Sequence, residues 1–337
     1  MKIGVFGLGR WGPRLIGKML GRPLIAGVSA FDIDGDRRSR VATEYPDVAV
    51  ADDERTILED PSIDAVVVAT PVRSHFDIAR KALENDKHVL CEKPLTGSVD
   101  EASALVELAS RRDLRLMVDH ITVYSGAVQR LKEIVDAGEL GEIQYIDAVR
   151  SNLGMLQQDV SVIWDLAIHD FAIIDRLMNE MPVAVSGTGA AFYGPQEEVA
   201  CASLFFNGGA VAYVHASWIS PVKIRRVLVG GKKRMALFDD TRGREKLLLF
   251  DSGVEAADIR AGAGEPFKYR SAEARPIVYS EHDTMDAMLD EFIRAVTQHR
   301  DPMTDGRAGL RMVNILSAVA RSLAQQGERL WLTRNEK

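Results

Sequence analysis

The fold is decided by the stretch KIGVFGLGRWG at residues 2–12. A short apolar run is followed at once by the pattern glycine-x-glycine-x-x-glycine, which Gly7, Gly9 and Gly12 form. Where a strand passes into a helix, such glycines allow a tight turn and let backbone N–H groups approach a pyrophosphate. The stretch therefore predicts a dinucleotide-binding turn, although glycines that serve only tight packing would give the same pattern.

An acidic residue supports the cofactor interpretation. Asp32 lies 20 positions after Gly12, at the end of the second expected strand, where a carboxylate can accept hydrogen bonds from ribose hydroxyls and repels a 2′-phosphate. We therefore expect NAD. Arg37 and Arg38 follow closely, so NADP stays possible, although the two arginines fit the solvated face of the next helix better. The glycine turn expected to hold the cofactor comprises Gly7, Leu8, Gly9, Arg10, Trp11 and Gly12.

The pattern of strands and helices predicts two domains in the 337 residues. From residue 2 to about 119, short apolar runs alternate with helical stretches, which is typical of a parallel sheet. Beyond it the strands are longer and are joined by turn signals such as Asn207-Gly208-Gly209, which indicates antiparallel pairing. We expect an α/β protein with a Rossmann domain at 1–120 and, at 121–337, an α/β domain for substrate binding and oligomerisation on a large, mainly antiparallel sheet.

The composition excludes several classes of function. A net charge of −7 argues against nucleic acid as a partner. Cys91 and Cys201 are far apart, which predicts neither a disulfide framework nor a thiolate zinc site and fits a reducing compartment. The seven histidines lack ligand spacing, so we expect no metal. No apolar run reaches the ~18 residues of a membrane span, so we expect a cytoplasmic protein.

Several motifs occur together with the glycine turn. They are the Ala69-Thr70-Pro71 turn and KHVLCEKP at residues 87–94. With these motifs the chain resembles the glucose–fructose oxidoreductase/inositol dehydrogenase (Gfo/Idh/MocA) family, of which Glu-Lys-Pro is the most specific mark. The stretches at 164–170, 220–240 and 301–316 are similar to the branch that acts on nucleotide-linked sugars.

The resemblance implies a cofactor, a reaction and an assembly. Members use NAD or NADP to oxidise a sugar or cyclitol hydroxyl or to reduce the ketone, and commonly form dimers or tetramers through the large sheet. It adds Thr70, Pro71, His75, Glu92 and Lys93 to the expected cofactor contacts, although strand termination and helix capping would also account for residues 70–75. The loop at 119–126 lacks the glycine usual before its histidine, which leaves the substrate open.

Lys93 is the first expected catalytic residue. Hydride transfer from a carbinol carbon needs a base for the hydroxyl proton and a cation for the developing alkoxide, and one amine can fill both roles. Lys93 is expected at the carboxyl end of a parallel strand, where open α/β sheets bind ligands. From the residues alone, a surface lysine at a strand end is equally compatible. The resemblance favours the catalytic role.

Asp165 and His169 are the other expected catalytic residues. They stand four positions apart in a helical stretch, which places both on one helix face. The histidine can shuttle a proton, and the carboxylate can fix its tautomer or bind a sugar hydroxyl. A solvent-facing pair is the plain alternative, but the resemblance implies that the pair flanks the reacting carbon. Asp170 points to another face, and we expect it to be structural.

Further substrate contacts are expected beside these residues. His120 ends the last Rossmann strand, although a buried, hydrogen-bonded histidine is equally compatible. Arg150 and Asn152 alternate on one strand, so their side chains face the same side. Lys223 and Arg225 also alternate, but fit a solvated sheet face better. The expected substrate-binding residues are Lys93, His120, Arg150, Asn152, Asp165 and His169.

Two other functions remain open at this stage. Some proteins that resemble this chain use bound NAD for a transient oxidation, with glycosidic cleavage or elimination as the net reaction. A non-catalytic cofactor-binding sensor is the third possibility. Lys93, Asp165 and His169 are all present, which favours an enzyme.

Overall fold

The chain forms two compact units in the computed structural model, which describes residues 1–256 and 267–332. Unit 1 comprises Met1–Tyr124 and Asp283–Asn314, and unit 2 comprises Ser125–His282 and the chain from Ile315 onward. The first crossing lies four residues after the boundary expected at 120/121. The sequence predicts residues 283–314 in the second domain, but in the structure they belong to unit 1.

Unit 1 is built on a six-stranded parallel sheet of the Rossmann order, β3-β2-β1-β4-β5-β6. The sheet is buried on both faces, so its strands are continuous apolar runs rather than alternating ones, as Ala65–Val68 illustrates. The strands are β1 (Lys2–Phe6), β2 (Gly27–Phe31), β3 (Ala49–Val50), β4 (Ala65–Val68), β5 (His88–Glu92) and β6 (Leu116–Asp119). All of their pairings are parallel, as expected from the alternating pattern.

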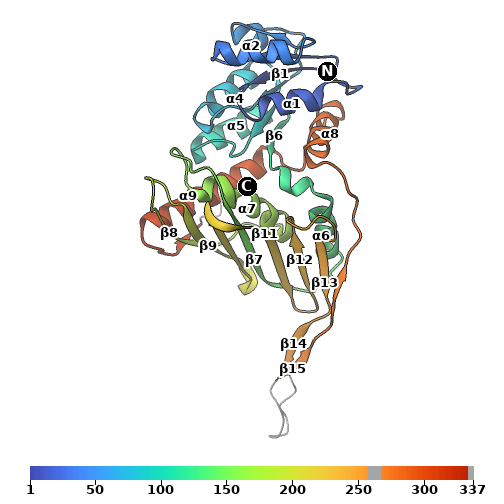
Figure 1. Ribbon diagram of the computed structural model, residues 1–337, viewed down its shortest axis with the longest axis vertical. Helices are drawn as coiled ribbons and strands as arrows, with labels where there is room; N and C mark the ends of the chain where they lie inside the picture. Colours follow the sequence, from blue (N-terminus) through green and yellow to red (C-terminus); the bar gives the residue numbers. More distant parts are fainter. Residues whose placement is uncertain (257–266, 333–337) are drawn as a thin grey trace. The chain divides into compact units, whose positions relative to one another are not determined.

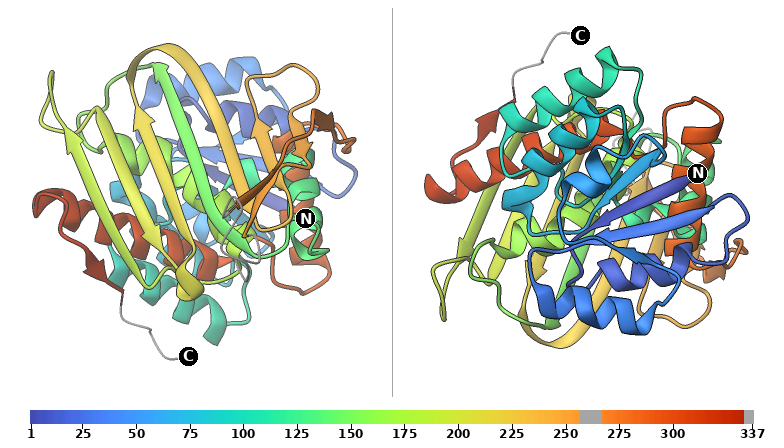
Figure 2. Two further views of the ribbon diagram at one scale, coloured as in Figure 1. Left: turned by 90° about the horizontal axis from the view of Figure 1, so that it is seen from below. Right: turned by 90° about the horizontal axis from the view of Figure 1, so that it is seen from above.

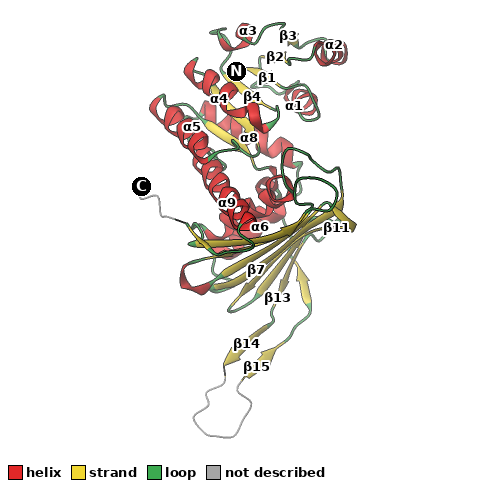
Figure 3. Ribbon diagram, turned by 90° about the vertical axis from the view of Figure 1, so that its left-hand side faces the viewer, coloured by secondary structure: helices red, strands yellow, loops and turns green. Residues whose placement is uncertain are grey.

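Helices cover both faces of this sheet (Figure 3). Helices α4 and α5 pack together, and α1 packs against α8. The helical segments of unit 1 are α1 (Gly12–Met19), α2 (Gly35–Glu44), α3 (Arg55–Leu58), η1 (Val72–Ser74), α4 (His75–Glu84), α5 (Val99–Arg111), η2 (Ile121–Tyr124) and α8 (Thr284–Thr297). Helix α9 (Gly306–Ala324) begins in unit 1 and ends in unit 2.

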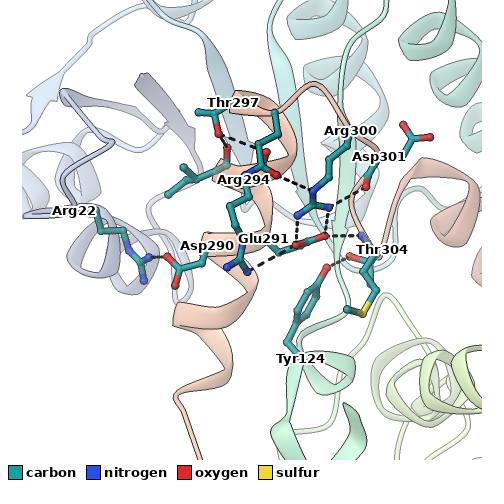
Figure 4. Close-up of polar contacts among 12 residues, drawn as sticks. Arg22, Tyr124, Asp290, Glu291, Arg294, Thr297, Arg300, Asp301 and Thr304 are labelled. Carbon is teal, nitrogen blue, oxygen red and sulfur yellow. Dashed lines mark hydrogen bonds and ion pairs between the residues drawn. The ribbon is translucent and has the colours of Figure 1, made fainter. Parts of the chain in front are cut away.

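A buried carboxylate braces the returning segment internally, and a neighbouring threonine joins that segment to the rest of unit 1 (Figure 4). Glu291 on α8 accepts two hydrogen bonds from the guanidinium of Arg300, at 2.8 and 2.6 Å, and one from the N–H of Met303 at 3.0 Å. These bonds hold the pKa of Glu291 below its usual range. Beside it, the hydroxyl of Thr304 donates to the carbonyl of Val118 on β6 at 2.6 Å and also pairs with the hydroxyl of Tyr124. The edge of the Rossmann sheet is thereby tied to residues that lie far away in sequence.

Unit 2 contains a nine-stranded sheet in the order β16-β13-β12-β11-β7-β10-β9-β8-β17. Its strands pair antiparallel except for β7 and β10, so the expected mainly antiparallel sheet is confirmed with one parallel pair. The strands are β7 (Ile143–Leu153), β8 (Ala184–Ala190), β9 (Val199–Phe205), β10 (Val211–Ser217), β11 (Ile219–Gly231), β12 (Met235–Asp239), β13 (Leu247–Phe250), β16 (Ala274–Pro276) and β17 (Leu330–Trp331).

Helices cover one face of this sheet. Helix α7 (Ile168–Met178) contacts β7 and β10, α6 (Gly126–Asp136) contacts β12, and the end of α9 reaches β8. The left view of Figure 2 looks onto the other face, over which no helix from the described part of unit 2 lies. Strands β14 (Gly253–Ala256) and β15 (Phe267–Arg270) form a separate two-stranded ribbon (Figure 1). Among the described residues, no helix is long and apolar enough to cross a membrane.

Candidate active site

The glycine turn has a distinct physical requirement at each of its three glycines. Gly7 has φ +93°, a left-handed conformation that side chains disfavour, and a Cβ there would lie 2.5 Å from the carbonyl oxygen of Ala69. A Cβ on Gly12 would lie 1.9 Å from the carbonyl oxygen of Gly7, so α1 can start this close to the strand only with glycine. A Cβ on Gly9 would meet only a guanidinium nitrogen of Arg37, at 3.6 Å. Gly9 therefore leaves open space above the turn, as close approach of a pyrophosphate requires.

Asp32 holds this turn together. Its carboxylate is 5% exposed and accepts the N–H of Leu8 at 2.6 Å and the N–H of Asp34 at 2.9 Å. A guanidinium nitrogen of Arg37 lies 3.5 Å from the same carboxylate, while Arg38 donates to the main-chain carbonyl of Asp32 at 2.8 Å. The two arginines therefore surround Asp32 rather than only facing solvent. Arg10 and Trp11 complete the turn, and the guanidinium of Arg10 lies 5.7 Å from the centre of the Trp11 ring.

His75 connects two loops at the carboxyl ends of the strands. It is 1% exposed, with Nδ1 2.9 Å from the carbonyl oxygen of Pro94 and Nε2 2.7 Å from that of Thr70. Burial lowers its pKa, so the ring is neutral and donates to one of the two carbonyls. The ring thus lies between the Thr70–Pro71 turn and the segment that follows Lys93, with one nitrogen bonded to one of the two carbonyls. The cofactor contact expected of His75 stays a prediction.

Lys93 follows the last residue of β5 and is half-buried, and its bond to Pro94 is a cis peptide. Glu92 ends β5 and lies opposite Asp119, the last residue of β6. The two carboxyls are buried side by side in the parallel register and act on each other's pKa, and Asp119 Oδ1 has no hydrogen-bond partner among the described residues. Burial raises the pKa of Glu92 well above its usual range and that of Asp119 to about 6. Glu92, expected to contact the cofactor, thus has its carboxyl engaged with Asp119.

His120 is enclosed beside this pair. Its side chain is 1% exposed, and neither ring nitrogen has a hydrogen-bond partner in the described part of the chain. Burial, together with the charges of Lys93 and Arg311, lowers its pKa to about 3. The side chain is therefore buried but lacks the hydrogen bonds of the alternative interpretation, and its contact with substrate stays a prediction. The ring carries no charge at neutral pH.

In unit 2, Asp165 and His169 flank a change in helical geometry. Asp165 lies in a π-helical turn, η3 (Ile163–Ala167), and His169 in the first turn of α7. The indole Nε1 of Trp218 donates to Asp165 Oδ2 at 3.0 Å, and Trp218 itself is 1% exposed. The expected regular helix is therefore wrong at its start. A π-turn widens the backbone locally and recurs at functional sites.

Arg150 has a structural partner. It is 4% exposed, and its guanidinium donates to both carboxylate oxygens of Asp170, at 2.9 and 2.8 Å. Asp170 is completely buried. The expectation that Arg150 binds substrate is not supported by this geometry, because burying a carboxylate on α7 demands a fixed cation and Arg150 supplies it. Arg225 is likewise paired, with Asp240 at 3.6 Å.

Asn152 lies on the same strand as Arg150 but is only half-buried. A Cβ on Gly154 would lie 2.6 Å from the amide nitrogen of Asn152 and 3.7 Å from the ring of Trp218. Asn152 therefore shares the neighbourhood of the tryptophan that holds Asp165. Of the substrate contacts expected in unit 2, Asp165 and Asn152 thus have Trp218 as a common neighbour.

The predicted residues fall into two sets. The glycine turn, Asp32, the Thr70–His75 segment, Lys93 and His120 are all in unit 1, at the carboxyl ends of its strands, where open α/β sheets bind ligands. The remaining residues belong to unit 2. Within the described ranges, no three histidine, cysteine or acidic side chains are grouped so that they could hold a metal ion.

Two residues were missed from the sequence. The partnership of Asp119 with Glu92 was detectable, because HVLCE and LMVD are neighbouring strands that both end in an acid. Trp218 gave no such signal, since a tryptophan at the end of an apolar strand is ordinary core material. Only the fold brings its indole to Asp165.

Comparison with known families decides the class. Residues 1–120 match the model described as "Oxidoreductase family, NAD-binding Rossmann fold", and residues 128–236 match the Gfo/Idh/MocA C-terminal domain. The chain belongs to the Gfo/Idh/MocA oxidoreductase family. It is therefore an NAD-dependent oxidoreductase, as the resemblance predicts. The open space above Gly9 and the left-handed Gly7 fit that cofactor.

Individual members of the family extend the likeness over nearly the whole chain. UDP-N-acetylglucosamine 3-dehydrogenase of Acidithiobacillus ferrooxidans is 30% identical over 93% of this chain and 94% of its own. A solved structure of that enzyme has a TM-score of 0.82, with 97% of this chain and 98% of the other covered. The scyllo-inositol 2-dehydrogenase (NAD⁺) of Bacillus subtilis is 30% identical over 77% of this chain and 79% of its own. GenD2 from gentamicin A biosynthesis, solved with NAD, shares the fold at 20% identity and a TM-score of 0.82 over 99% of this chain and 96% of the other.

Proposed function

We propose that this Gfo/Idh/MocA protein oxidises a secondary hydroxyl of a nucleotide-linked sugar, with C3 of a UDP-linked N-acetylhexosamine as the leading candidate. The observation that carries the proposal is the full-length likeness to UDP-N-acetylglucosamine 3-dehydrogenase, which covers both units. The catalytic groups named above supply the chemistry of such an oxidation.

Lys93, Asp165 and His169 are the proposed catalytic residues. When NAD is bound, its nicotinamide accepts the hydride. The amine of Lys93 takes the hydroxyl proton and, as an ammonium, stabilises the developing alkoxide. His169 serves as a further proton-transfer group, and the carboxylate of Asp165 accepts a hydrogen bond from a sugar hydroxyl.

Trp218 supports the role of Asp165. Its indole N–H is bonded to one carboxylate oxygen, Oδ2, which fixes the orientation of the side chain. A carboxylate has further lone pairs, so a substrate hydroxyl can still donate to it. Because the indole is buried, the orientation is set before substrate arrives, as efficient catalysis requires.

A substrate panel tests the proposed reaction. Purified protein with NAD is mixed in turn with UDP-N-acetylglucosamine, free N-acetylglucosamine and myo-inositol, and the absorbance of reduced nicotinamide is followed. We expect the nucleotide sugar to give the highest kcat/KM. A higher value for free sugar or inositol would reject the nucleotide-linked substrate. Consumption of substrate without accumulation of reduced NAD would indicate a transient oxidation with a non-redox net reaction.

Variants test the catalytic residues. Lys93→Ala and His169→Ala should each lower kcat by about 10²-fold or more, because each removes a proton-transfer group. The affinity for NAD, measured by calorimetry, should change little. Arg80→Ala is a matched control, since Arg80 lies on α4 in a surface pair with Glu84. If both active-site variants keep the turnover of the control, the proposed roles are wrong.

The proposal also covers the choice of cofactor, the oligomeric state and the cellular location. Arg37 beside Asp32 supports some acceptance of NADP, which parallel titrations of the two cofactors would measure. The helix-free face of the nine-stranded sheet supports a homodimer or homotetramer, which light scattering would detect. Both cysteines are free, which supports the cytoplasm as the location.

A further inference from the structure

Two neighbouring strands of unit 1 end in acidic residues that face each other. Glu92 closes β5 and Asp119 closes β6, and the two are partners in the parallel register. Glu92 is 9% exposed and Asp119 is 5% exposed. Two ionised carboxylates in such a place would repel each other strongly.

The hydrogen bond between the two carboxyls requires a proton. A carboxylate has no donor, so one member of the pair must carry the O–H that the other accepts. Burial raises the pKa of both groups, so one of the two carboxyls keeps its proton and donates to the other. At neutral pH the pair therefore holds one proton and one negative charge.

The pair has both charged and neutral titratable neighbours. Lys93 directly follows Glu92, and its charge acts on both carboxyls. His120 is neutral because burial and two nearby cations depress its pKa, and burial keeps Cys91 a thiol by raising its pKa. The titratable groups around the pair in the described part of the chain include His75, Cys91, Lys93, His120, Tyr124 and Arg311, and the acidic Glu291 and Asp305 from the returning segment.

We propose that Glu92 and Asp119 are a positioning pair for catalysis, which holds one shared proton and presents a single negative charge to Lys93. This inference rests on the proposed catalytic role of Lys93. The charge stabilises the ammonium that forms when Lys93 takes the substrate proton. The shared proton keeps that charge at one, so the ammonium can still release its proton when the reaction runs toward reduction.

Variants can separate the charge from the hydrogen bond. In Glu92→Gln, the amide donates to the Asp119 carboxylate, so both the bond and the single charge persist. In the double variant Glu92→Gln/Asp119→Asn, a hydrogen bond remains but the charge is gone. Glu92→Gln is therefore the matched control for the double variant.

The pH dependence of kcat for oxidation is the kinetic readout. Oxidation needs the neutral amine of Lys93, so the rate rises with pH. Without the negative charge the ammonium is less stable, and we expect the rising limb of the double variant to move to lower pH by about one unit. In Glu92→Gln, kcat should rise over the same pH range as in the wild type. A limb that stays in place in a folded, NAD-binding double variant would overturn the proposal.

Infrared spectroscopy tests the shared proton without relying on activity. At about pH 8, an exposed carboxyl is fully ionised. We expect the wild-type protein to show the C=O stretch of a buried protonated carboxyl, and Glu92→Gln to lose it. Absence of the band from the wild type, or its persistence in Glu92→Gln, would contradict the pair, whether or not the double variant folds.

Lys93→Ala distinguishes this inference from the proposed function. If Lys93 is the base, the rising limb disappears in that variant, while the infrared band remains. If the limb persists, the assignment of Lys93 is wrong and the kinetic part of the inference falls with it. Loss of the band in Glu92→Gln would then still establish the shared proton by itself.

Discussion

Single residues of the glycine turn separate folding from binding. Gly9→Ala adds a methyl group that meets only the flexible end of Arg37, so the free energy of unfolding should hardly change. The same methyl occupies the space above the turn, and we expect NAD affinity to fall by about 10-fold or more. Calorimetric titration and chemical unfolding measure the two effects. Unchanged affinity would mean that the cofactor does not approach Gly9.

Gly12→Ala provides the contrast. Its Cβ would overlap the carbonyl oxygen of Gly7, which is backbone and cannot move aside cheaply. We expect a loss of about 2 kcal/mol or more in the free energy of unfolding. A variant as stable as the wild type would show that α1 can start farther from the strand than the structure has it.

Sequence reasoning at the residue scale succeeded where geometry is local. The tight turn predicted from the three glycines is present, with Gly7 at φ +93° and Gly12 directly against the carbonyl of Gly7. It failed where a partner comes from elsewhere in the chain. Arg150 was expected to bind substrate because alternation places it on one face of a strand, but alternation does not say what covers that face. Asp170 covers it.

The contact between β7 and α7 illustrates stability at the scale of elements. Arg150 and Asp170 are both buried and joined by two hydrogen bonds. Arg150→Met leaves the carboxylate unpaired, and we expect the free energy of unfolding to fall by about 3–5 kcal/mol. Arg150→Met/Asp170→Leu should recover much of the loss, because no charge then stays buried. Chemical unfolding of both variants is the measurement; equal losses would argue against the buried pair.

The π-turn before α7 was not predictable from spacing. Asp165 and His169 fit a regular helix by periodicity, and the residues between them contain neither proline nor glycine to indicate a break. In the structure, the wider turn contains Asp165, which accepts a hydrogen bond from Trp218, the residue directly after β10. The π-turn therefore occurs together with a contact to a residue 53 positions away in sequence, and the pattern of residues 163–178 alone does not reveal such a contact.

For the whole molecule, the sequence predicted the class of both sheets. Apolar runs gave the parallel sheet of unit 1, and alternating strands with glycine turns gave the mainly antiparallel sheet of unit 2. The return of residues 283–314 to unit 1 was not foreseen, because a helical pattern does not reveal which core it joins. Thr304 and Asp286 make that connection, through Val118 and Tyr124 and through Lys18.

In the proposed reaction, this protein transfers a hydride from a sugar carbon to NAD. The most direct test uses UDP-N-acetylglucosamine deuterated at C3, with mass spectrometry of the nicotinamide cofactor after a single turnover. We predict reduced cofactor that carries the deuterium, in wild-type protein and in Arg80→Ala but hardly at all in Lys93→Ala. Reduced cofactor without deuterium would place the reaction at another carbon. Failure of the nucleotide sugar and of the other sugars in the panel to reduce NAD would contradict the proposed reaction.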